Sequence, residues 1–452
     1  MLSGGFYYIL IERILKSIFM PYFTIKGGKT LKGSIEVKPA KNSAVAILCA
    51  TCMIPGKTTL TRVPVIEEVK RIIEVLTSIG LQIEWKRSDK LEIINEGNID
   101  LEQLDHEAFS KTRSGILLLG ALSSLKDQFS LPKTGGCKLG KRTANPHIMA
   151  LEHLGFHIEE KTDFHRISQQ NPGGTEFVMY ESGDTATENA VMAASKLSGT
   201  TTIHFASANY MVRDLCHFLN RAGADISGLE SSKFSIEGVQ ELNPVAEYAI
   251  MPDPIEAMTL ISIAITTGSR ITVVGCPIDF LRLELEKLKV MGQKMNISDV
   301  YTSESGHFDL VDIEIIPSQL NALDDKIYGR PFPGLNIDNL PLFLPILTQA
   351  HGQTLVHDWP YENRAIYYTE LNRLGAHTML HDPHRITITG PTKLQPAEII
   401  CPPALRPAVN MVICMLAADG TSILRNGYSI ERGYENLVER LNELGAEIEK
   451  EE

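Results

Sequence analysis

The sequence predicts an α/β fold of two similar domains, each built from three copies of one repeated unit. A helix–glycine–strand motif recurs six times along the 452 residues, and a second strand motif alternates with it. Helices that alternate with strands in this way predict layered α/β structure. Prolines interrupt the chain near its middle, in MPDPIEAM at Met251–Met258, and divide the six units into two groups of three.

The first motif is the end of a helix, a glycine and the apolar start of a strand. Its copies begin 68 to 83 residues apart. Glycine after the last turn of a helix commonly adopts the left-handed conformation, and the chain then turns into the next element. The six copies are LTSIGLQI at Leu76–Ile83, LEHLGFHI at Leu151–Ile158, LNRAGADI at Leu219–Ile226, LKVMGQKM at Leu288–Met295, LNRLGAHT at Leu371–Thr378 and LNELGAEI at Leu441–Ile448.

The second motif is a strand that follows an Ala-, Ile- or Leu-rich helical stretch. Glycine comes first, and Thr, Ser or Arg then alternates with Ile, Leu or Val, as in a strand with one buried face. Five copies read PGKTTLTRV, SGTTTIHFA, TGSRITVVG, HGQTLVHDW and DGTSILRNG. A further expected copy, LKDQFSLP, lacks the glycine. Each unit is therefore expected to contain two helices and several strands.

The domain boundaries follow from the grouping of the units. We expect domain 1 to span residues 42–252, and domain 2 to combine residues 21–41 with residues 253–452. The chain then crosses between the domains near Lys41 and again within Met251–Met258. Two similar domains joined by two strands predict a hinge, with the active site in the cleft between them.

The first twenty residues differ from the rest of the chain. Their apolar run is broken by Glu12, Arg13 and Lys16, so it is too short and too charged to span a bilayer. We expect an upstream extension that precedes a start at Met20. The alternative is an amphipathic helix at a membrane surface.

Composition limits the function classes. A net charge of −12 argues against a nucleic-acid partner, so an anionic ligand must meet a local cluster of cations. The seven cysteines are scattered and odd in number, which favours a reducing, cytoplasmic compartment over a disulfide framework. Cys49 and Cys52 have C-x-x-C spacing, but they lie in an apolar helical run and are interpreted as core residues. The oligomeric state stays open.

One loop, PKTGGCKLGKRTANPH at Pro132–His147, brings a thiol close to several cations. Cys137 follows two glycines, and Lys138, Lys141 and Arg142 come within the next five residues, with no acid in the loop. Neighbouring positive charge lowers the pKa of a thiol and makes it reactive. The glycines are typical of a lid that moves.

Five further segments are informative together: VKPAKNSAVAILCA, GGCKLGKRTANPHIMALEHLG, TATENAVMAA, YENRAIYYTELNRLGAH and YSIERGYENLVERLNELGAEIE. They resemble the UDP-N-acetylglucosamine enolpyruvyl transferases (1-carboxyvinyltransferases), and the similarity runs from Met20 to the C-terminus. The resemblance implies two inverse α/β barrels of three units each around a cleft, and a reaction without metal or organic cofactor. The substrates would be phosphoenolpyruvate and UDP-N-acetylglucosamine.

The resemblance also implies roles for individual residues. Asp338 would be the base at the sugar 3-hydroxyl, and Cys137 would protonate the vinyl carbon or assist product release and react with fosfomycin. Lys41 would both bind phosphoenolpyruvate and take part in catalysis. The other residues implied for phosphoenolpyruvate or its phosphate are Arg142, Arg406 and Arg432, and those for the UDP-sugar are Asn42, Arg113, Asn145, His147 and Arg364.

Each of these residue types has a structural alternative. Lys41 fits a solvated turn, and Asp338 lies in a Pro-, Gly- and Asn-rich segment where a carboxylate often forms a turn. Arg432 fits the surface of a helix start, and Arg364 fits a structural ion pair with Glu362. Cys137 fits a free surface thiol.

The chain departs from the family pattern mainly on the acceptor side and in the hinge. Asn145 and Ala404 replace family acids, and Ala208–Val212 replaces an acidic stretch. PDPIEAM and PGLNID also differ from the usual motifs. Three hypotheses remain: transfer to UDP-N-acetylglucosamine in peptidoglycan synthesis, transfer to another acceptor, and a UDP-sugar sensor without catalysis.

Overall fold

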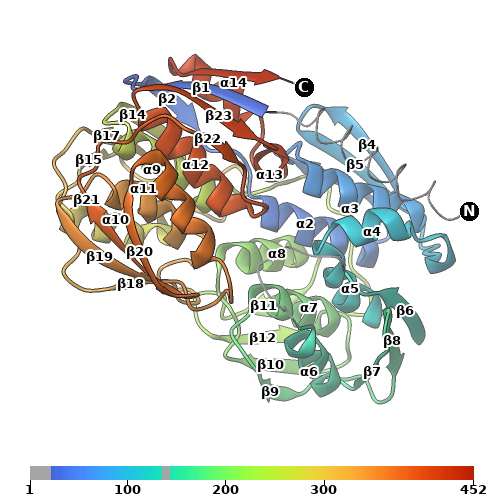
Figure 1. The fold of residues 1–452 in the computed structure, drawn as a ribbon. Coiled ribbons are helices and arrows are strands. Elements are labelled where there is room, and N and C mark those ends of the chain that lie inside the picture. Colours follow the sequence, from blue (N-terminus) through green and yellow to red (C-terminus); the bar gives the residue numbers. More distant parts are fainter. Residues whose placement is uncertain (1–21, 135–142, 452) are drawn as a thin grey trace, which may run out of the picture.

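The computed structural model describes residues 22–134 and 143–451 and shows six small sheets packed around two sets of helices (Figure 1). Three sheets are formed by strands between residues 56 and 249. The other three are built from strands between residues 270 and 451, and two of them also include a strand from residues 22–36. The predicted residues 1–20, Cys137 and Arg142 lie outside the described part of the chain.

The first group of sheets holds the strands from the middle of the sequence. Their orders are β13-β3-β5-β4, β6-β8-β7 and β11-β12-β10-β9. The strands are β3 (Gly56–Thr61), β4 (Gln82–Arg87), β5 (Lys90–Asn95), β6 (Gln128–Pro132), β7 (Phe156–Glu160), β8 (Phe164–Gln169), β9 (Glu176–Val178), β10 (Thr200–His204), β11 (Asp225–Ser227), β12 (Lys233–Glu237) and β13 (Tyr248–Ala249). The helices are α2 (Lys41–Ala50), α3 (Glu67–Ser78), α4 (His106–Lys111), α5 (Leu118–Ser123), α6 (Asn145–His153), α7 (Asp184–Ala194) and α8 (Tyr210–Arg221).

The second group joins the start of the described chain to its C-terminal part. Its sheet orders are β15-β17-β14-β2, β18-β19-β21-β20 and β22-β23-β1-β24. The strands are β1 (Tyr22–Gly27), β2 (Lys32–Glu36), β14 (Arg270–Pro277), β15 (Lys294–Ile297), β16 (Tyr301–Thr302), β17 (Asp309–Ile316), β18 (Ile327–Tyr328), β19 (Gly352–His357), β20 (His377–Asp382), β21 (Arg385–Gly390), β22 (Glu398–Ile400), β23 (Gly420–Arg425) and β24 (Glu447–Glu451). The helices are α9 (Pro254–Thr266), α10 (Arg282–Val290), α11 (Phe343–Leu347), α12 (Leu405–Ala417), α13 (Tyr428–Glu431), α14 (Leu437–Glu443) and the 3₁₀ helix η6 (Ala365–Leu374).

The helix–glycine–strand motif is confirmed in all six copies. Each of its glycines has a positive φ, between 82° and 112°, and each is followed by a strand, β4, β7, β11, β15, β20 or β24. The second motif also forms the strands expected of it, β3, β10, β14, β19 and β23. LKDQFSLP forms β6 without the glycine, because its Phe129 and Leu131 alternate with exposed residues and are buried.

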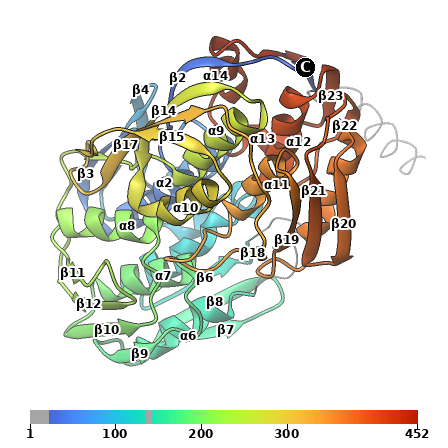
Figure 2. The same ribbon diagram turned by 90° about the vertical axis from the view of Figure 1, so that its left-hand side faces the viewer.

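The helices that precede the second motif form the cores. α2, α5 and α7 pack together in the first group. α9, α11 and α12 pack together in the second group, where Figure 2 labels all three helices. All thirteen residues of α9 are buried, which suits a helix that is apolar on every side. Cys49 and Cys52 lie in the first core, 0% and 2% exposed, as expected of core residues.

The two crossing segments lie side by side. Pro39 and Pro252 form an antiparallel bridge. The Ala40 N–H donates to the Met251 carbonyl at 2.8 Å, and the Asp253 N–H donates to the Lys38 carbonyl at 2.8 Å. We propose residues 42–252 as domain 1 and residues 21–41 with 253–452 as domain 2, because the sheets separate at these crossings.

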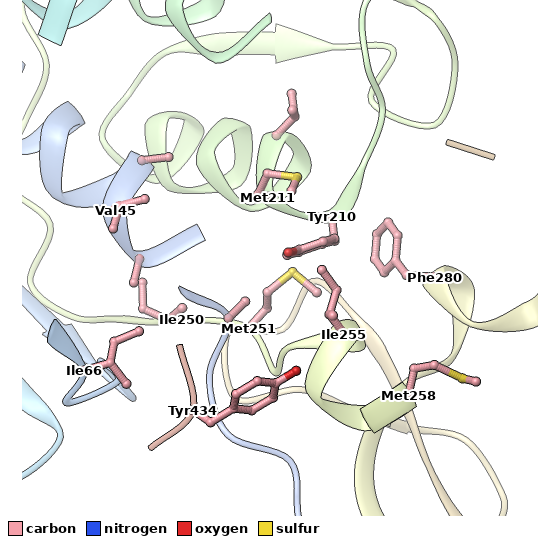
Figure 3. Close-up of a cluster of buried hydrophobic side chains, with 14 of the residues drawn as sticks. Val45, Ile66, Tyr210, Met211, Ile250, Met251, Ile255, Met258, Phe280 and Tyr434 are labelled. Atoms are coloured by element: carbon pink, nitrogen blue, oxygen red, sulfur yellow. The ribbon is translucent and has the colours of Figure 1, made fainter. Parts of the chain in front are cut away.

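Apolar side chains from both groups of helices meet beside the crossings (Figure 3). The Tyr210 ring at the start of α8 meets the Phe280 ring edge-on, with centroids 6.0 Å apart. Met251 of the crossing segment and Ile255 of α9 lie in the same cluster. The cluster therefore ties the two halves together at the crossings. In the described residues no helix has the length and apolar character needed to cross a membrane.

Candidate active site

A cleft of about 840 Å³ lies between the two groups of sheets. The starts of α2 and α7 line one wall, and the starts of α10 and α12 line the other. The predicted site residues among its lining are Lys41, Asn42, Arg113, His147, Asp338, Arg364, Arg406 and Arg432. Asn145 is exposed at the first position of α6 and is not among the described residues that line the cleft.

One end of the cleft is cationic. Lys41 is the first residue of α2, directly after a crossing, and Arg432 directly follows α13. Arg432 Nη2 lies 2.9 Å from Glu68 Oε2 of α3, so this ion pair joins the two walls. Burial alone would raise the pKa of Glu68, but the charges of Lys41 and Arg432 hold that pKa below its ordinary value. Two cations beside a helix N-terminus can bind a phosphate or a carboxylate.

Arg406 links the cationic end to the middle of the cleft. It lies in the first turn of α12 and is 7% exposed. Its Nη1 donates to the Tyr434 hydroxyl at 2.8 Å, and its Nη2 lies 3.7 Å from Asp338 Oδ2. Although burial works against the charge, Tyr434 and Asp338 raise the pKa of Arg406, so the guanidinium stays protonated.

Asp338 is held between two arginines. Its Oδ1 accepts from Arg364 Nη1 at 3.2 Å and from the Tyr361 hydroxyl at 3.4 Å, while Arg406 approaches Oδ2. The side chain is 25% exposed to the cleft. A carboxylate with fixed partners on one side and solvent on the other can take a proton from a bound hydroxyl.

Arg364 is the buried anchor of this arrangement. It is 1% exposed, and its guanidinium donates to both oxygens of Asp358 at 2.6 and 2.8 Å and to the Ile337 carbonyl at 2.6 Å. Arg364 therefore makes a buried structural ion pair with Asp358, a partner other than the Glu362 considered from the sequence. Because Ile337 precedes Asp338, Arg364 fixes both the backbone and the carboxylate at this point.

The opposite wall places Asn42 and His147 among polar partners. Asn42 Nδ2 donates to the Tyr210 hydroxyl at 3.0 Å. His147 Nδ1 lies 2.7 Å from the Asn189 amide nitrogen, so the ring accepts there and carries its proton on Nε2. Burial, with the charge of Arg113, lowers the pKa of His147 to about 3. The imidazole is therefore neutral and serves as a hydrogen-bond donor rather than as an acid.

Sequence reasoning gave no role to two carboxylates of α7. Asp184 begins the helix, and Glu188 follows one turn later, and both line the cleft. For Glu188 a signal was available in TATENAVMAA, because an acid among mostly small residues of a helix can be a buried charge. Only the fold shows that both acids line the same cleft as Asp338.

A family model for EPSP synthase (3-phosphoshikimate 1-carboxyvinyltransferase) matches residues 25–441. The chain belongs to this enolpyruvyl transferase family. UDP-N-acetylglucosamine 1-carboxyvinyltransferases of several bacteria are similar to almost the whole chain. That of Bacteroides thetaiotaomicron is 32% identical over 440 residues, covering 95% of this chain and 99% of the relative. That of Treponema denticola is 33% identical over 435 residues, covering 96% and 100%. The resemblance noted in the sequence is thereby confirmed, and the chain is a divergent member.

Solved enolpyruvyl transferases share the fold. The enolpyruvyl transferase NikO from Streptomyces tendae superposes with a TM-score of 0.83 at 21% identity, covering 96% of this chain and 99% of that one. EPSP synthase from Acinetobacter baumannii gives a TM-score of 0.73 at 19% identity, covering 96% and 100%. The predicted fold class of this transferase is therefore confirmed, and in the described residues each of the two groups contains three separate sheets.

Proposed function

We propose that this transferase moves the enolpyruvyl group of phosphoenolpyruvate to the 3-hydroxyl of UDP-N-acetylglucosamine and releases phosphate. The observation that carries the proposal is the position of Asp338 between Arg364 and Arg406, in the same cleft as Lys41 and Arg432. A carboxylate base beside a cationic anion site is what the reaction requires. The names of the relatives identify the acceptor class.

Phosphoenolpyruvate would bind at the cationic end. Its carboxylate and phosphate need several converging cations, and Lys41, Arg406 and Arg432 line this part of the cleft. Arg142 would add a fourth cation. Binding would replace the Glu68 carboxylate as the partner of Arg432, because both are anions that compete for one guanidinium.

The reaction would proceed by addition and elimination. The Cys137 thiol protonates the vinyl carbon, and its neighbouring carbon becomes electrophilic. Asp338 takes the proton of the attacking hydroxyl as the new carbon–oxygen bond forms. The Cys137 thiolate then takes a proton back from the methyl group as the bond from the neighbouring carbon to the phosphate oxygen breaks. The proton held by Asp338 passes to the departing group, and hydrogen phosphate leaves toward the cations. In the net reaction, the same carbon of the enolpyruvyl group loses its bond to the phosphate oxygen and gains a bond to the sugar oxygen.

In the cell the product would be the first committed precursor of peptidoglycan, made in the cytoplasm for cell shape and division. Cys137 would be the residue that fosfomycin alkylates. A second candidate is transfer to a different nucleotide or sugar acceptor. The TM-score of 0.83 with NikO, an enolpyruvyl transferase of a different name, favours keeping this candidate.

Phosphate release separates these hypotheses. We would incubate the protein with phosphoenolpyruvate and a panel of UDP-sugars and nucleotides, and measure inorganic phosphate. We expect release with UDP-N-acetylglucosamine. Release only with another acceptor would replace the first proposal by the second. Tight binding of a UDP-sugar, with no phosphate released in the presence of any acceptor, would support the third hypothesis, a UDP-sugar sensor without catalysis. Cys137→Ser should abolish labelling by fosfomycin, and unchanged labelling and turnover would refute the role of the thiol.

A further inference from the structure

The turn that carries Asp338 is held by its own side chains. Asn336 Oδ1 accepts from the Asp338 N–H at 2.9 Å, and the Asn336 carbonyl accepts from the Asn339 N–H at 3.0 Å. An asparagine that binds the N–H two residues further on is typical of a tight turn. Asn336 therefore fixes the backbone of Asp338 directly.

Glu284 of α10 holds both ends of this turn with one oxygen. Its Oε1 accepts from the Asn336 N–H at 3.1 Å and from Asn339 Nδ2 at 2.9 Å. Along the chain, Asp338 lies between these two donors. Glu284, Asn336 and Asp338 all line the cleft. The backbone position of Asp338 thus depends on a side chain more than fifty residues earlier in the sequence.

The burial of Glu284 is unusual for its place in a helix. It lies in the first turn of α10, where an acid commonly interacts with the helix dipole from the surface, but its side chain is only 2% exposed. Burial raises the pKa of Glu284, and the hydrogen bonds from Asn339 and Asn336 oppose this shift. Since a buried carboxylate is costly unless donors meet it, the contacts with the turn account for its presence.

We propose that Glu284 is a positioning residue, which holds the turn at residues 336–339 so that Asp338 meets the acceptor hydroxyl in the reactive orientation. The inference rests on the proposed function and adds a residue to it. Arg364 and Arg406 fix the carboxylate end of Asp338, and Glu284 fixes its backbone end. Glu284 exchanges no proton with the substrates and acts only through the turn.

Glu284→Val tests the proposal, because it removes the acceptor oxygen and keeps an apolar side chain that can be buried. We expect kcat to fall by roughly tenfold to a hundredfold, since a displacement of about 1 Å at a reacting group can cost a hundredfold. The KM for phosphoenolpyruvate should stay unchanged, because Lys41 and Arg432 remain. Glu284→Gln keeps an acceptor oxygen and should retain most of the native kcat. Glu286→Val, at an exposed acid of the same helix, is the matched control and should change neither constant.

A background without the base separates positioning from a general effect on the fold. In Asp338→Asn the proton acceptor is gone, so its orientation no longer matters. We expect Glu284→Val to change kcat by less than about twofold in this background, against tenfold or more in the native protein. Equal losses in both backgrounds, a native kcat in Glu284→Val, or a Glu284→Gln variant as slow as Glu284→Val would overturn the proposal.

Hydrogen exchange measured by mass spectrometry tests the same contacts without turnover. The amides of Asn336 and Asp338 are held by Glu284 and by the Asn336 side chain. We expect faster exchange in a peptide spanning residues 334–342 of Glu284→Val, and native exchange in Glu284→Gln. If Glu284→Val does not fold, Asn336→Ala removes the acceptor of the Asp338 N–H. A loss of kcat that disappears in the Asp338→Asn background is again expected.

Failure of the proposed function would look different. The native protein would then release no phosphate with UDP-N-acetylglucosamine, and the kinetic comparison would use the acceptor from the panel that supports release. With no such acceptor, hydrogen exchange decides. Faster exchange confined to residues 334–342 in Glu284→Val would support the role of Glu284 in holding the turn, and unchanged exchange would refute it.

Discussion

At the scale of single residues, the Asp338 carboxylate depends on side chains from two other segments of the chain. Tyr361 and Arg364 hold one carboxylate oxygen, and Arg406 of α12 approaches the other. These contacts orient the group and leave it 25% exposed to the cleft. The position of this carboxylate is therefore a property of the folded chain rather than of the local loop.

Replacing Asp338 by Asn should remove the base and keep the shape of the site. We expect kcat to fall by roughly two to four orders of magnitude, the usual contribution of a general base. The affinity for phosphoenolpyruvate should change little, because Lys41 and Arg432 remain. Steady-state kinetics and phosphoenolpyruvate titration would check this. A variant that keeps native kcat would exclude Asp338 as the base.

Arg364→Lys should affect both stability and activity. Lysine cannot donate to both oxygens of Asp358 and to the Ile337 carbonyl at once. We expect the free energy of unfolding to fall by about 3 kcal/mol, as for other broken buried ion pairs, and kcat to fall about tenfold because Asp338 is displaced. Denaturant unfolding and kinetics measure the two effects. Arg385→Lys, in an exposed pair with Asp382, is the control and should change neither.

The site could be predicted only in part from the residues. Lys41 and Arg432 were expected there from motifs, and both line the cleft. Asp358 could not be recognised as a partner of Arg364, because the pairing depends on how the segment folds back on itself. Glu188 carries no local feature that places it in a cleft. Its burial results from the packing of α7 against α5, α6 and α8.

At the scale of elements, the motif glycines control the turn from helix to strand. Gly155 has φ +89°, and a Cβ there would lie 2.0 Å from the Asn171 carbonyl oxygen. Gly445 has φ +98°, but a Cβ there would meet no atom within 4 Å. The same conformation is thus crowded in one unit and open in another.

The two glycines predict that alanine lowers the free energy of unfolding by different amounts at Gly155 and at Gly445. Gly445→Ala should cost about 1 kcal/mol, from the left-handed backbone alone. Gly155→Ala should cost clearly more, because the carbonyl of Asn171 must also move. Thermal or urea unfolding of the two variants would decide. Equal costs would show that backbone conformation, and not close approach, requires glycine at Gly155.

The elements were predicted well because their signals are local. Each motif glycine closes a helix by its own conformation, and alternating apolar residues mark the strands. The segment Ala365–Leu374 is an exception, since it forms a 3₁₀ helix rather than an α-helix. Local sequence patterns could not predict that β1 pairs with β23 and β24, because these strands lie about 400 residues further along the chain.

At the scale of the whole molecule, Asp214 connects α8 to a crossing between the domains. It is fully buried, its Oδ1 accepts from the Tyr248 hydroxyl at 2.6 Å, and its Oδ2 accepts from the Met251 N–H at 3.3 Å. Met251 also accepts from Ala40 of the other crossing. Burial raises the pKa of Asp214 to about 7, although these hydrogen bonds oppose the shift.

The raised pKa predicts a pH-dependent stability. Between pH 5 and pH 7 folded Asp214 keeps a proton that the unfolded chain has lost, since its pKa there is about 4. The contribution of this group to stability is present in acid and is lost as the pH rises toward 7. As the pH rises from 5 to 7, the free energy of unfolding of the native protein should therefore fall by roughly 1 kcal/mol per pH unit relative to that of the Asp214→Asn variant.

Urea unfolding at pH 5, 6, 7 and 8 measures the difference in free energy of unfolding between the native protein and Asp214→Asn. This difference should level off above pH 7. Asp163→Asn, whose carboxylate is exposed, should give a constant difference from native protein across the series. A constant difference for Asp214→Asn as well would show that this carboxyl is already ionised at pH 5.

The position of β1 determines the order in which the molecule can be completed during translation. β1 is translated early, but both of its neighbours, β23 and β24, come from the far end of the chain. The sheets between residues 56 and 249 contain all their strands once that segment has left the ribosome. β1 must wait with both edges unpaired until Gly420–Arg425 is synthesised, and with one edge unpaired until Glu447–Glu451 follows. The nascent chain thus exposes a strand that a chaperone or a second nascent chain can pair with until translation ends.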